Sequence, residues 1–375
     1  MAKHLHIISF NVPFPANYGG VIDVFHKIRW LHEVGIKVHL HCFHYGRNEA
    51  KKLEQYCESV HYYPRRSFLS NFSELPYIVN SRRHPALLQR LLQDEYPILF
   101  EGLHCCYLMN HESLKGRMKI FRESNIEHEY YEALLKNEAK WWKKFYFKFE
   151  AYRLQKFESV LAHANQIVTV SEKDAEYFKQ KFTKNKVTNI PSFHENDFVT
   201  TELGKGDFIL FHGNLSVVEN SEAAKFLIEK VAIKSNYKFI IAGLNPSSEL
   251  KECIQKAAKK NITLVENPND ETMNKLMHSA HIHFLYTHQT TGLKLKLINS
   301  LYKGKFVLLN DKMLHGVDVG NECIIANDEN SFVQKIDELM LKNFMPEQLE
   351  QRNEWVKTKF NNEQNCEKLL SLIYS

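Results

Sequence analysis

Short apolar runs alternate with helix-like segments along this chain, and that alternation constrains its fold more than any other feature. In the first half we expect strands at Leu5–Phe10, Val38–Phe43, Ile98–Leu103, Lys119–Arg122 and Ile167–Val170. Helix-like segments separate these runs, and the first of them, Val21–Val34, is expected to end at Gly35. Strands that alternate with helices build βαβ units around a parallel sheet. The first half is therefore predicted to be a doubly wound α/β domain.

The same pattern restarts in the second half. There we expect strands at Phe208–Phe211, Phe239–Ala242, Ile262–Val265, Ile282–Tyr286, Phe306–Leu309 and Cys323–Ile325. The polar stretch Thr200–Gly206 is expected to be the linker, and 375 residues suit two domains. We predict an α/β fold with Rossmann-like domains over 1–198 and 207–349 that face each other across a cleft. A helix over 350–375 is expected to pack back on the first domain, and ligands are expected at the carboxyl ends of the strands.

Composition narrows the classes of function. The net charge of +5 allows an anionic ligand but does not demand nucleic acid, so no nucleic-acid partner is expected. Seven cysteines without a C-x-x-C pair are typical of a reducing cytoplasm. The N-terminus reads as a first strand and not as a signal peptide, and no apolar run is long enough to span a membrane. A cytoplasmic protein is therefore expected.

The stretch Thr290–Leu309 reads as a polar loop, an amphipathic helix, a glycine stop and a buried strand. A loop that feeds a helix N-terminus offers free backbone N–H groups and the positive end of the helix dipole. Lys294 and Lys296 lie beside that end, so the place suits a diphosphate. The alternative is an ordinary strand–loop–helix–strand unit with exposed lysines. Gly19 and Gly20 would likewise allow a ligand to approach the backbone closely at the N-terminus of the first helix.

These features together resemble the family-four glycosyltransferases of bacterial polysaccharide assembly, which have the GT-B architecture. Arg122–Tyr131 reads R-E-S-N-I-E-H-E-Y-Y, which resembles the R-x-x-N-I-E-H-x-Y-Y element of a subgroup typical of Bacteroidetes. Thr287–Leu309 resembles the T-x-x-T-G-L-K-L-K-L-x-N-x-L element of the same subgroup. The resemblance implies a retaining hexosyltransferase, with mannosyl transfer as one guess. Its donor would be a UDP- or GDP-linked sugar, and its acceptor a glycan or a lipid-linked glycan. No cofactor is expected, and no metal, since no two aspartates stand two residues apart as a metal-dependent GT-A enzyme would need.

The resemblance also assigns residues, with departures. The broader family has two glutamates that contact the donor, and Thr291 and Asn299 stand in their places. It has an arginine and a lysine where this chain has Asn214 and Glu219, so Lys294 and Lys296 are expected to supply the positive charge. The predicted donor-binding residues are Gly19, Gly20, Gly213, Asn214, Asn267, Thr290, Thr291, Gly292, Leu293 and Asn299.

A catalytic base is harder to assign. Ser124 stands where the resemblance implies a histidine, so the remaining candidates are His128, Glu123 and Glu127. For His128 a purely structural role at the start of a helix is an equal alternative. The departures leave two other functions open, a catalytically degenerate sugar-nucleotide-binding protein and a GT-B nucleotide-sugar epimerase. An NAD(P) oxidoreductase fits poorly, because no G-x-G-x-x-G follows any expected strand.

The segment 136–158 is unusually aromatic and basic. Projected as a helix, Trp142, Phe145, Phe149 and Tyr152 form a stripe, and Lys140, Lys143, Lys144 and Lys148 lie largely opposite. One interpretation is an interfacial helix that contacts anionic lipid at the inner membrane. The other, commoner one is a helix that packs the stripe on its own domain and leaves its basic face in water.

Overall fold

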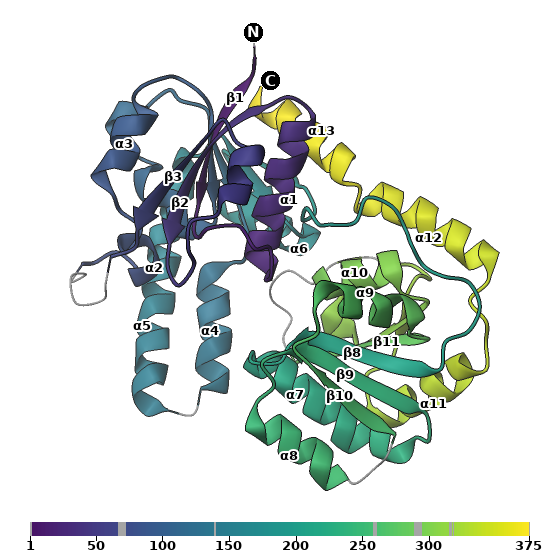
Figure 1. Cartoon of the computed structure of the whole chain (residues 1–375). Helices are drawn as coiled ribbons and strands as arrows, with labels where there is room; N and C mark the ends of the chain where they lie inside the picture. The colour runs from purple at the N-terminus through teal and green to yellow at the C-terminus, as the bar shows by residue number, and fades with distance from the viewer. Residues whose placement is uncertain are drawn as a thin grey trace. The chain divides into compact units, whose positions relative to one another are not determined.

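The computed structural model describes residues 2–66, 73–138, 140–257, 261–288, 295–314, 317 and 319–374. It divides into two compact units (Figure 1). Unit 1 contains Met1–Glu195 and Asn361–Ser375, and unit 2 contains the described residues of 196–360. No helix among the described residues is long and apolar enough to cross a membrane.

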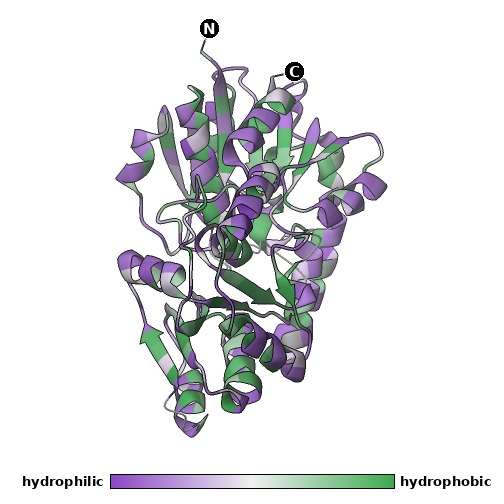
Figure 2. Cartoon of the chain, turned by 90° about the vertical axis from the view of Figure 1, so that its right-hand side faces the viewer, coloured by the Kyte–Doolittle hydropathy of each residue, from purple (hydrophilic) through white to green (hydrophobic). Residues whose placement is uncertain are grey.

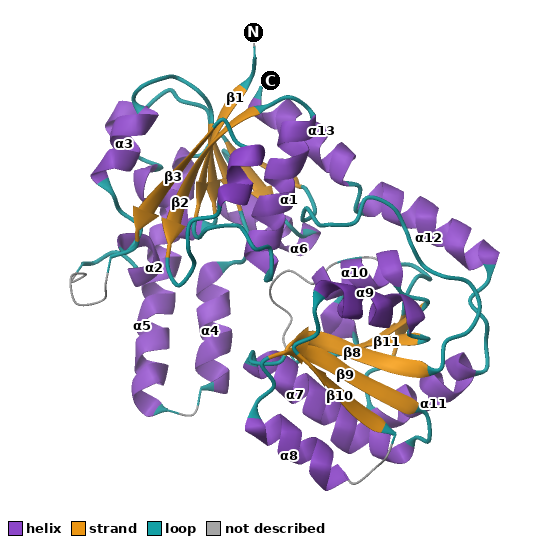
Figure 3. Ribbon diagram, viewed as in Figure 1, coloured by secondary structure: helices purple, strands orange, loops and turns teal. Residues whose placement is uncertain are grey.

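Unit 1 is built on a seven-stranded parallel sheet in the order β3-β2-β1-β4-β5-β6-β7. Figure 3 shows the strands of each unit in orange with purple helices around them. The strands are β1 (His4–Ser9), β2 (Lys37–His44), β3 (Ser59–Pro64), β4 (Ile98–Glu101), β5 (Lys119–Arg122), β6 (Gln166–Thr169) and β7 (Lys186–Asn189). The helices are α1 (Gly19–Glu33), α2 (Tyr77–Asn80), α3 (Pro85–Leu91), α4 (Glu127–Asn137), α5 (Trp141–Phe157), α6 (Glu172–Lys181) and α13 (Asn362–Ile373).

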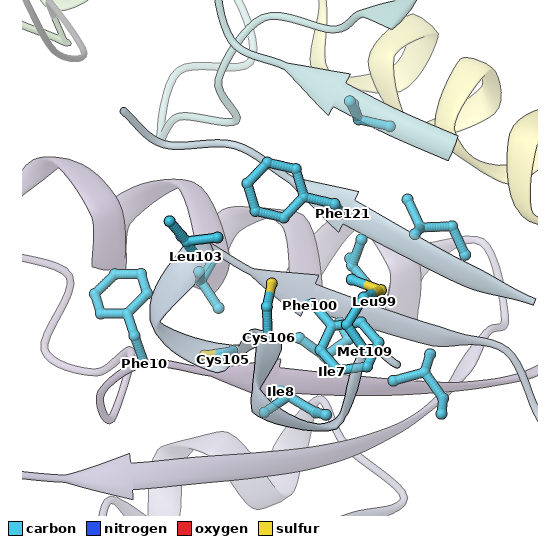
Figure 4. Packing of buried hydrophobic residues seen from close by; sticks show 14 of the residues in the cluster. Ile7, Ile8, Phe10, Leu99, Phe100, Leu103, Cys105, Cys106, Met109 and Phe121 are labelled. Carbon is cyan, nitrogen blue, oxygen red and sulfur yellow. The ribbon is translucent and has the colours of Figure 1, made fainter. Parts of the chain in front are cut away.

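The core of unit 1 lies on both faces of this sheet. Ile7 of β1 pairs with Leu40 of β2, and all three of Ile7, Leu40 and Leu99 are fully buried. Figure 4 shows side chains of this core, with Phe10, Leu103 and Cys105 beyond the ends of β1 and β4. A strand covered on both faces is largely apolar, which explains the apolar runs Ile7–Ile8 in β1 and Ile98–Phe100 in β4.

Local signals set the helix ends. Gly35 has a φ of +80°, a conformation that favours glycine, and follows the last residues of α1. Ser171 caps α6, where its hydroxyl accepts a hydrogen bond from the backbone N–H of Asp174 at 3.1 Å. The end of α1 at Gly35 agrees with the expectation from sequence.

Unit 2 has a six-stranded parallel sheet in the order β10-β9-β8-β11-β12-β13. The strands are β8 (Phe208–Asn214), β9 (Lys238–Leu244), β10 (Ile262–Glu266), β11 (Ile282–Leu285), β12 (Phe306–Leu309) and β13 (Ile324–Ile325). The helices are α7 (Val218–Phe226), α8 (Ser248–Ala257), α9 (Asp270–Ser279), α10 (Leu295–Lys303), α11 (Glu329–Met340) and α12 (Pro346–Lys359). In both units the central strands are hydrophobic, and the helices have mixed hydrophobic and hydrophilic surfaces (Figure 2).

The tail expected as one helix over 350–375 forms two helices. Helix α12 belongs to unit 2 and α13 to unit 1, where Cys366, Leu369 and Leu372 join the core. The break falls at Phe360 and Asn361, because the Asn361 side chain caps α13 by accepting from the N–H of Gln364 at 2.9 Å. The chain first passes from unit 1 to unit 2 between Glu195 and Asn196.

Helices α4 and α5 run side by side as a hairpin of unit 1 (Figure 1). The inner face of α5 carries Glu150, Ala151 and Leu154, which are buried. The aromatic stripe faces outward, and Phe145 and Tyr152 are exposed. The expectation that the stripe packs on its own domain is therefore wrong. Helical projection alone could not show which face the α4 contact would cover.

Candidate functional site

In unit 2, the candidate site lies where the direction of strand addition reverses. From β8 the chain adds β9 and β10 on one side and then returns to place β11 on the other side of β8. Crevices at the carboxyl ends of such strands bind ligands in open α/β sheets. Gly213 and Asn214 form the carboxyl end of β8, and Thr287 follows the carboxyl end of β11, which pairs with β8.

Lys296, in the first turn of α10, reaches this edge. Its Nζ donates a hydrogen bond to Oδ1 of Asn220 and lies 5.3 Å from the centre of the Phe211 ring. A Cβ at Gly213 would lie 3.1 Å from Cε and Nζ of Lys296, so the glycine gives the lysine its room. The Asn220 amide in turn donates to the carbonyl of Asn214 at 2.8 Å. The structure thus brings Lys296, Gly213 and Asn214 together as the sequence predicts; that they bind a donor stays a prediction.

Glu219 contributes the opposite charge near the same edge. It lies in the first turn of α7, and its carboxylate accepts a hydrogen bond from the hydroxyl of Thr287. Asn310 fixes Thr287 by accepting from its N–H at 3.2 Å and donating to its carbonyl at 2.8 Å. This carboxylate is therefore held in place, and a bound diphosphate would need the charge of Lys296 to outweigh it.

The other predicted donor residues have different surroundings. Oδ1 of Asn299 accepts a hydrogen bond from the side-chain amide of Asn196 at 2.8 Å, so it ties α10 to the beginning of unit 2. Asn267 follows β10 with a φ of +48°, and its Oδ1 accepts from the N–H of Asn245 at 2.8 Å. Thr290, Thr291, Gly292, Leu293 and Lys294 lie outside the described residues.

Unit 1 has its own reversal point, between β1 and β4. Gly19 and Gly20 open α1 just beyond β1, as expected. A Cβ on Gly20 would lie 2.6 Å from Cζ of Phe10, so this glycine makes room for the Phe10 ring. That ring lies 5.4 Å from the ring of His104, which follows β4.

His104 and Glu127 form a pair at this edge. Nδ1 of His104 lies 3.6 Å from Oε1 of Glu127, and neither atom has a hydrogen-bond partner among the described residues. Burial raises the pKa of Glu127 to about 8, with a contribution from Glu158, although Arg82 acts against it. Burial, with Arg82 and Arg65 adding to it, holds the pKa of His104 well below its usual value. At neutral pH the pair is a protonated carboxyl beside a neutral imidazole, which can hold a hydroxyl group.

Of the three candidate bases named from sequence, Glu127 lies beside His104, whereas Glu123 and His128 have other neighbours. Glu123 is fully buried and accepts from the N–H of Val170 at 3.1 Å, and burial, reinforced by Asp174, holds its pKa well above the usual value. His128 is buried with Nδ1 3.6 Å from Glu158, whose other oxygen accepts from the hydroxyl of Tyr177 at 2.7 Å. These contacts favour the structural alternative for His128.

Sequence reasoning missed His104. The signal that could have found it is its position two residues after Gly102, at the end of an apolar strand. Gly102 has a φ of +73°, and a Cβ there would lie 3.0 Å from Nδ1 of His104. Which strands flank the reversal point depends on the order of strands in the sheet, and only the fold shows that order.

No protein-family model matches the chain. An uncharacterized 44.6 kDa protein in the cps region of Klebsiella pneumoniae is 27% identical over 356 residues, which are 90% of this chain and 90% of that protein. A TarM variant from S. aureus, in complex with fondaparinux, α-GlcNAc-glycerol and UDP, has a TM-score of 0.70 at 13% identity and covers 100% of both chains. Alr3699/HepE from Anabaena, in complex with UDP and glucose, has a TM-score of 0.66 at 11% identity and also covers 100% of both. The expected fold class is confirmed: this chain has the GT-B fold of these structures.

Proposed function

We propose that this chain is a retaining glycosyltransferase that acts at the cytoplasmic face of the membrane in the synthesis of a surface polysaccharide. It moves a hexosyl group from a nucleoside-diphosphate sugar to a glycan or a lipid-linked glycan. The observation that carries the proposal is the placement of Lys296 against Gly213 and Asn220 at the reversal point of the second sheet. UDP in the TarM and HepE structures favours a uridine donor over a guanosine donor, and the cps location of the Klebsiella relative supports polysaccharide synthesis.

The leaving group sets the main chemical demand. The bond between the anomeric carbon and the phosphate oxygen breaks, and the diphosphate gains negative charge as it departs. A lysine held in a partly buried site stabilises that charge more strongly than one in water. Lys296 fits this role because Asn220 and the Phe211 ring keep its ammonium at the edge of the sheet.

The acceptor hydroxyl forms the new bond to the anomeric carbon and loses its proton, which the departing phosphate oxygen takes up. We assign the hydroxyl to the His104–Glu127 pair in unit 1. The protonated carboxyl of Glu127 and the neutral imidazole of His104 can donate to and accept from it. The pair orients the acceptor, and a positioned hydroxyl lowers the barrier by proximity.

One alternative has a specific observation in its favour. Asn299, which stands in place of a family glutamate, is engaged by Asn196, and Glu219 places a negative charge near the proposed diphosphate site. A protein that binds sugar nucleotides without transferring the sugar would have these features. A nucleotide-sugar epimerase differs from a transferase because it converts its sugar nucleotide without any acceptor.

The test is calorimetry with UDP, GDP and their sugar conjugates, followed by product analysis with and without acceptor. Lys296→Ala should weaken binding of the diphosphate by about tenfold or more, because a charge-assisted contact is lost. Lys275→Ala, at an exposed lysine of α9, removes the same charge as a control. Unchanged affinity in Lys296→Ala would overturn the assigned site. Binding without transfer would favour the non-catalytic alternative, and sugar interconversion without acceptor would favour the epimerase.

A further inference from the structure

The outer surface of α5 is exposed, aromatic and basic at once. The exposed fractions are 80% for Trp141, 54% for Trp142, 73% for Phe145, 48% for Phe149 and 63% for Tyr152. Lys144, Lys148 and Lys156 are exposed on the same helix. We call these eight residues the α5 outer face. Its lysines lie away from the buried side formed by Glu150, Ala151 and Leu154, so the expectation that Lys144 and Lys148 lie opposite the aromatic stripe is wrong. A water-facing helix surface with so many large aromatic side chains is uncommon and marks an interaction site.

The rest of the hairpin explains why this face points outward. Glu150 is buried, accepts from the N–H of Tyr77 at 2.7 Å, and pairs with Arg153 at 3.3 Å. The Arg153 guanidinium lies 4.2 Å from the centre of the Phe149 ring, so it supports that ring from the side. These contacts fix the rotation of α5 about its own axis.

The charges on the outer face select the partner. Among the described residues of α5, the single carboxylate is that of Glu150, which is turned inward. At the turn, Glu138 pairs with Lys143 at 3.5 Å. The outer face is thus positive without compensation from its own helix, and two copies of it would repel each other.

We propose that the α5 outer face docks the protein on an anionic lipid bilayer. Tryptophan and other aromatic rings settle at the level of the headgroups, and lysines beside them bind anionic lipid. Both groups occur together on one helix surface. The docking stands independently of the proposed transfer reaction.

The position of the hairpin relates membrane docking to the choice of acceptor, an inference that rests on the proposed function. Helix α4 carries Glu127 at its first residue and leads to the hairpin turn after 11 residues, about 16 Å at the rise of an α-helix. A lipid-linked acceptor in the bilayer would therefore lie about one short helix from the His104–Glu127 pair. The inferred acceptor class is a glycan carried on a membrane lipid.

The test is co-sedimentation of the full chain with sucrose-loaded vesicles. We expect binding to phosphatidylglycerol–phosphatidylcholine vesicles, loss of binding in high salt, and little binding to phosphatidylcholine alone. The variant Lys144→Gln/Lys148→Gln/Lys156→Gln should bind anionic vesicles at least tenfold more weakly, since each lysine near such a surface contributes about fivefold. Trp142→Ser/Phe145→Ser should weaken binding similarly.

Two controls match these variants. Lys173→Gln/Lys179→Gln/Lys184→Gln removes the same charge from exposed positions on and beside α6, and Phe198→Ser/Leu341→Ser removes exposed apolar side chains from unit 2. Both controls should bind as the unchanged protein does. Equal loss in the control lysine variant would overturn the proposal, and so would absence of binding to anionic vesicles. A third outcome is that the unchanged protein forms concentration-dependent dimers and does not bind vesicles. If Trp142→Ser/Phe145→Ser then abolishes the dimers, the α5 outer face binds a second copy of the chain instead.

Because vesicle binding needs no sugar nucleotide, the two proposals can fail separately. Lys296→Ala should still bind vesicles, and the α5 variants should still bind the nucleotide. Transfer to a lipid-linked acceptor in vesicles should fall in the α5 variants, while transfer to a water-soluble acceptor should not change.

Discussion

The side-chain amide of Asn362 hydrogen-bonds both backbone groups of His194. Its Oδ1 accepts from the His194 N–H at 3.2 Å, and its Nδ2 donates to the His194 carbonyl at 2.9 Å. His194 lies one residue before the end of the first segment of unit 1, and Asn362 one residue after the start of the second. The two points where the chain leaves and re-enters unit 1 are therefore held side by side.

We expect Asn362→Ala to loosen this junction. Buried backbone groups that lose their partners cost about 1–3 kcal/mol, and amide exchange in the peptide around 190–195 should rise accordingly. Hydrogen–deuterium exchange of the full chain measures this. Gln364→Ala, at an exposed position of the same helix, is the control. If amide exchange near His194 is the same in Asn362→Ala as in the unchanged protein, the two Asn362–His194 hydrogen bonds do not stabilise this junction.

The raised pKa of Glu127 predicts how stability depends on pH. The folded state holds this proton up to about pH 8, and the unfolded state releases it near 4.5. Between these values the folded state binds more protons, so the free energy of unfolding falls as pH rises. The total effect is on the order of 5 kcal/mol. Glu127→Gln, a neutral substitute, should flatten this fall.

The check is denaturant unfolding of unit 1 at several pH values. Glu127→Gln should be more stable than the unchanged protein near pH 8 and similar to it near pH 4.5. Glu132→Gln, at an exposed position of α4, should leave the pH dependence as it is. A variant and parent with parallel pH profiles would show that Glu127 ionises normally in the folded chain.

His104 is predicted to act on transfer and not on donor binding. His104→Ala should lower kcat by about 10²-fold, because the acceptor hydroxyl loses part of its positioning. The affinity for the nucleoside diphosphate should not change, because Lys296 lies in the other unit. Steady-state kinetics and calorimetry separate these effects. Loss of nucleotide affinity together with kcat would contradict the division of roles.

A network of histidines on the first sheet predicts sensitivity to acid. Nδ1 of His6 lies 2.9 Å from Nε2 of His41, and Nε2 of His6 lies 3.0 Å from the carboxylate of Asp94. Burial lowers the pKa of His6 to about 4; His39 and Arg117 add to this, and Asp94 opposes it. As pH falls from 6.5 to about 4, His6 becomes protonated in the unfolded state but not in the folded state, so the free energy of unfolding decreases.

The expected loss is on the order of 3 kcal/mol over that range. His6→Gln should reduce it, which thermal unfolding at stepped pH would measure. The exposed His163 provides the comparison, since His163→Gln should leave the acid dependence unchanged. Identical acid dependence in His6→Gln and the parent would locate the sensitivity elsewhere.

Arg122 is predicted to contribute strongly to the stability of unit 1. It pairs with Asp23 at 3.0 Å and donates to the carbonyls of Thr169 and Ile190 at 3.2 Å and 2.5 Å. Arg122→Met should destabilise the protein by about 3–5 kcal/mol, because the Asp23 carboxylate stays buried without its main partner. Lys37→Met breaks an exposed pair with Glu58 and should cost about 0–1 kcal/mol. Urea unfolding compares the two, and equal effects would contradict the argument.

Edge strands show a limit of sequence reading. β3 and β7 were not predicted, because they lie at the two edges of the first sheet and are not continuous apolar runs. In β3 the residues 59–62 are all only partly buried, and β7 begins with the exposed Lys186. A strand with one open side needs less apolar surface than a central one, so its signal in the sequence is weak.

By itself the sequence determined the α/β class, the two-fold repetition of the pattern and the ends of helices such as α1 and α6. Those properties follow from local periodicity, a left-handed glycine and a capping serine, which act over a few residues. Only the tertiary structure decided that His104 stands beside Glu127, that Asn299 is engaged by Asn196, and that the aromatic face of α5 points outward. Each of these depends on strand order or helix rotation, because contacts between residues far apart in the chain are made by packing and not by local preference.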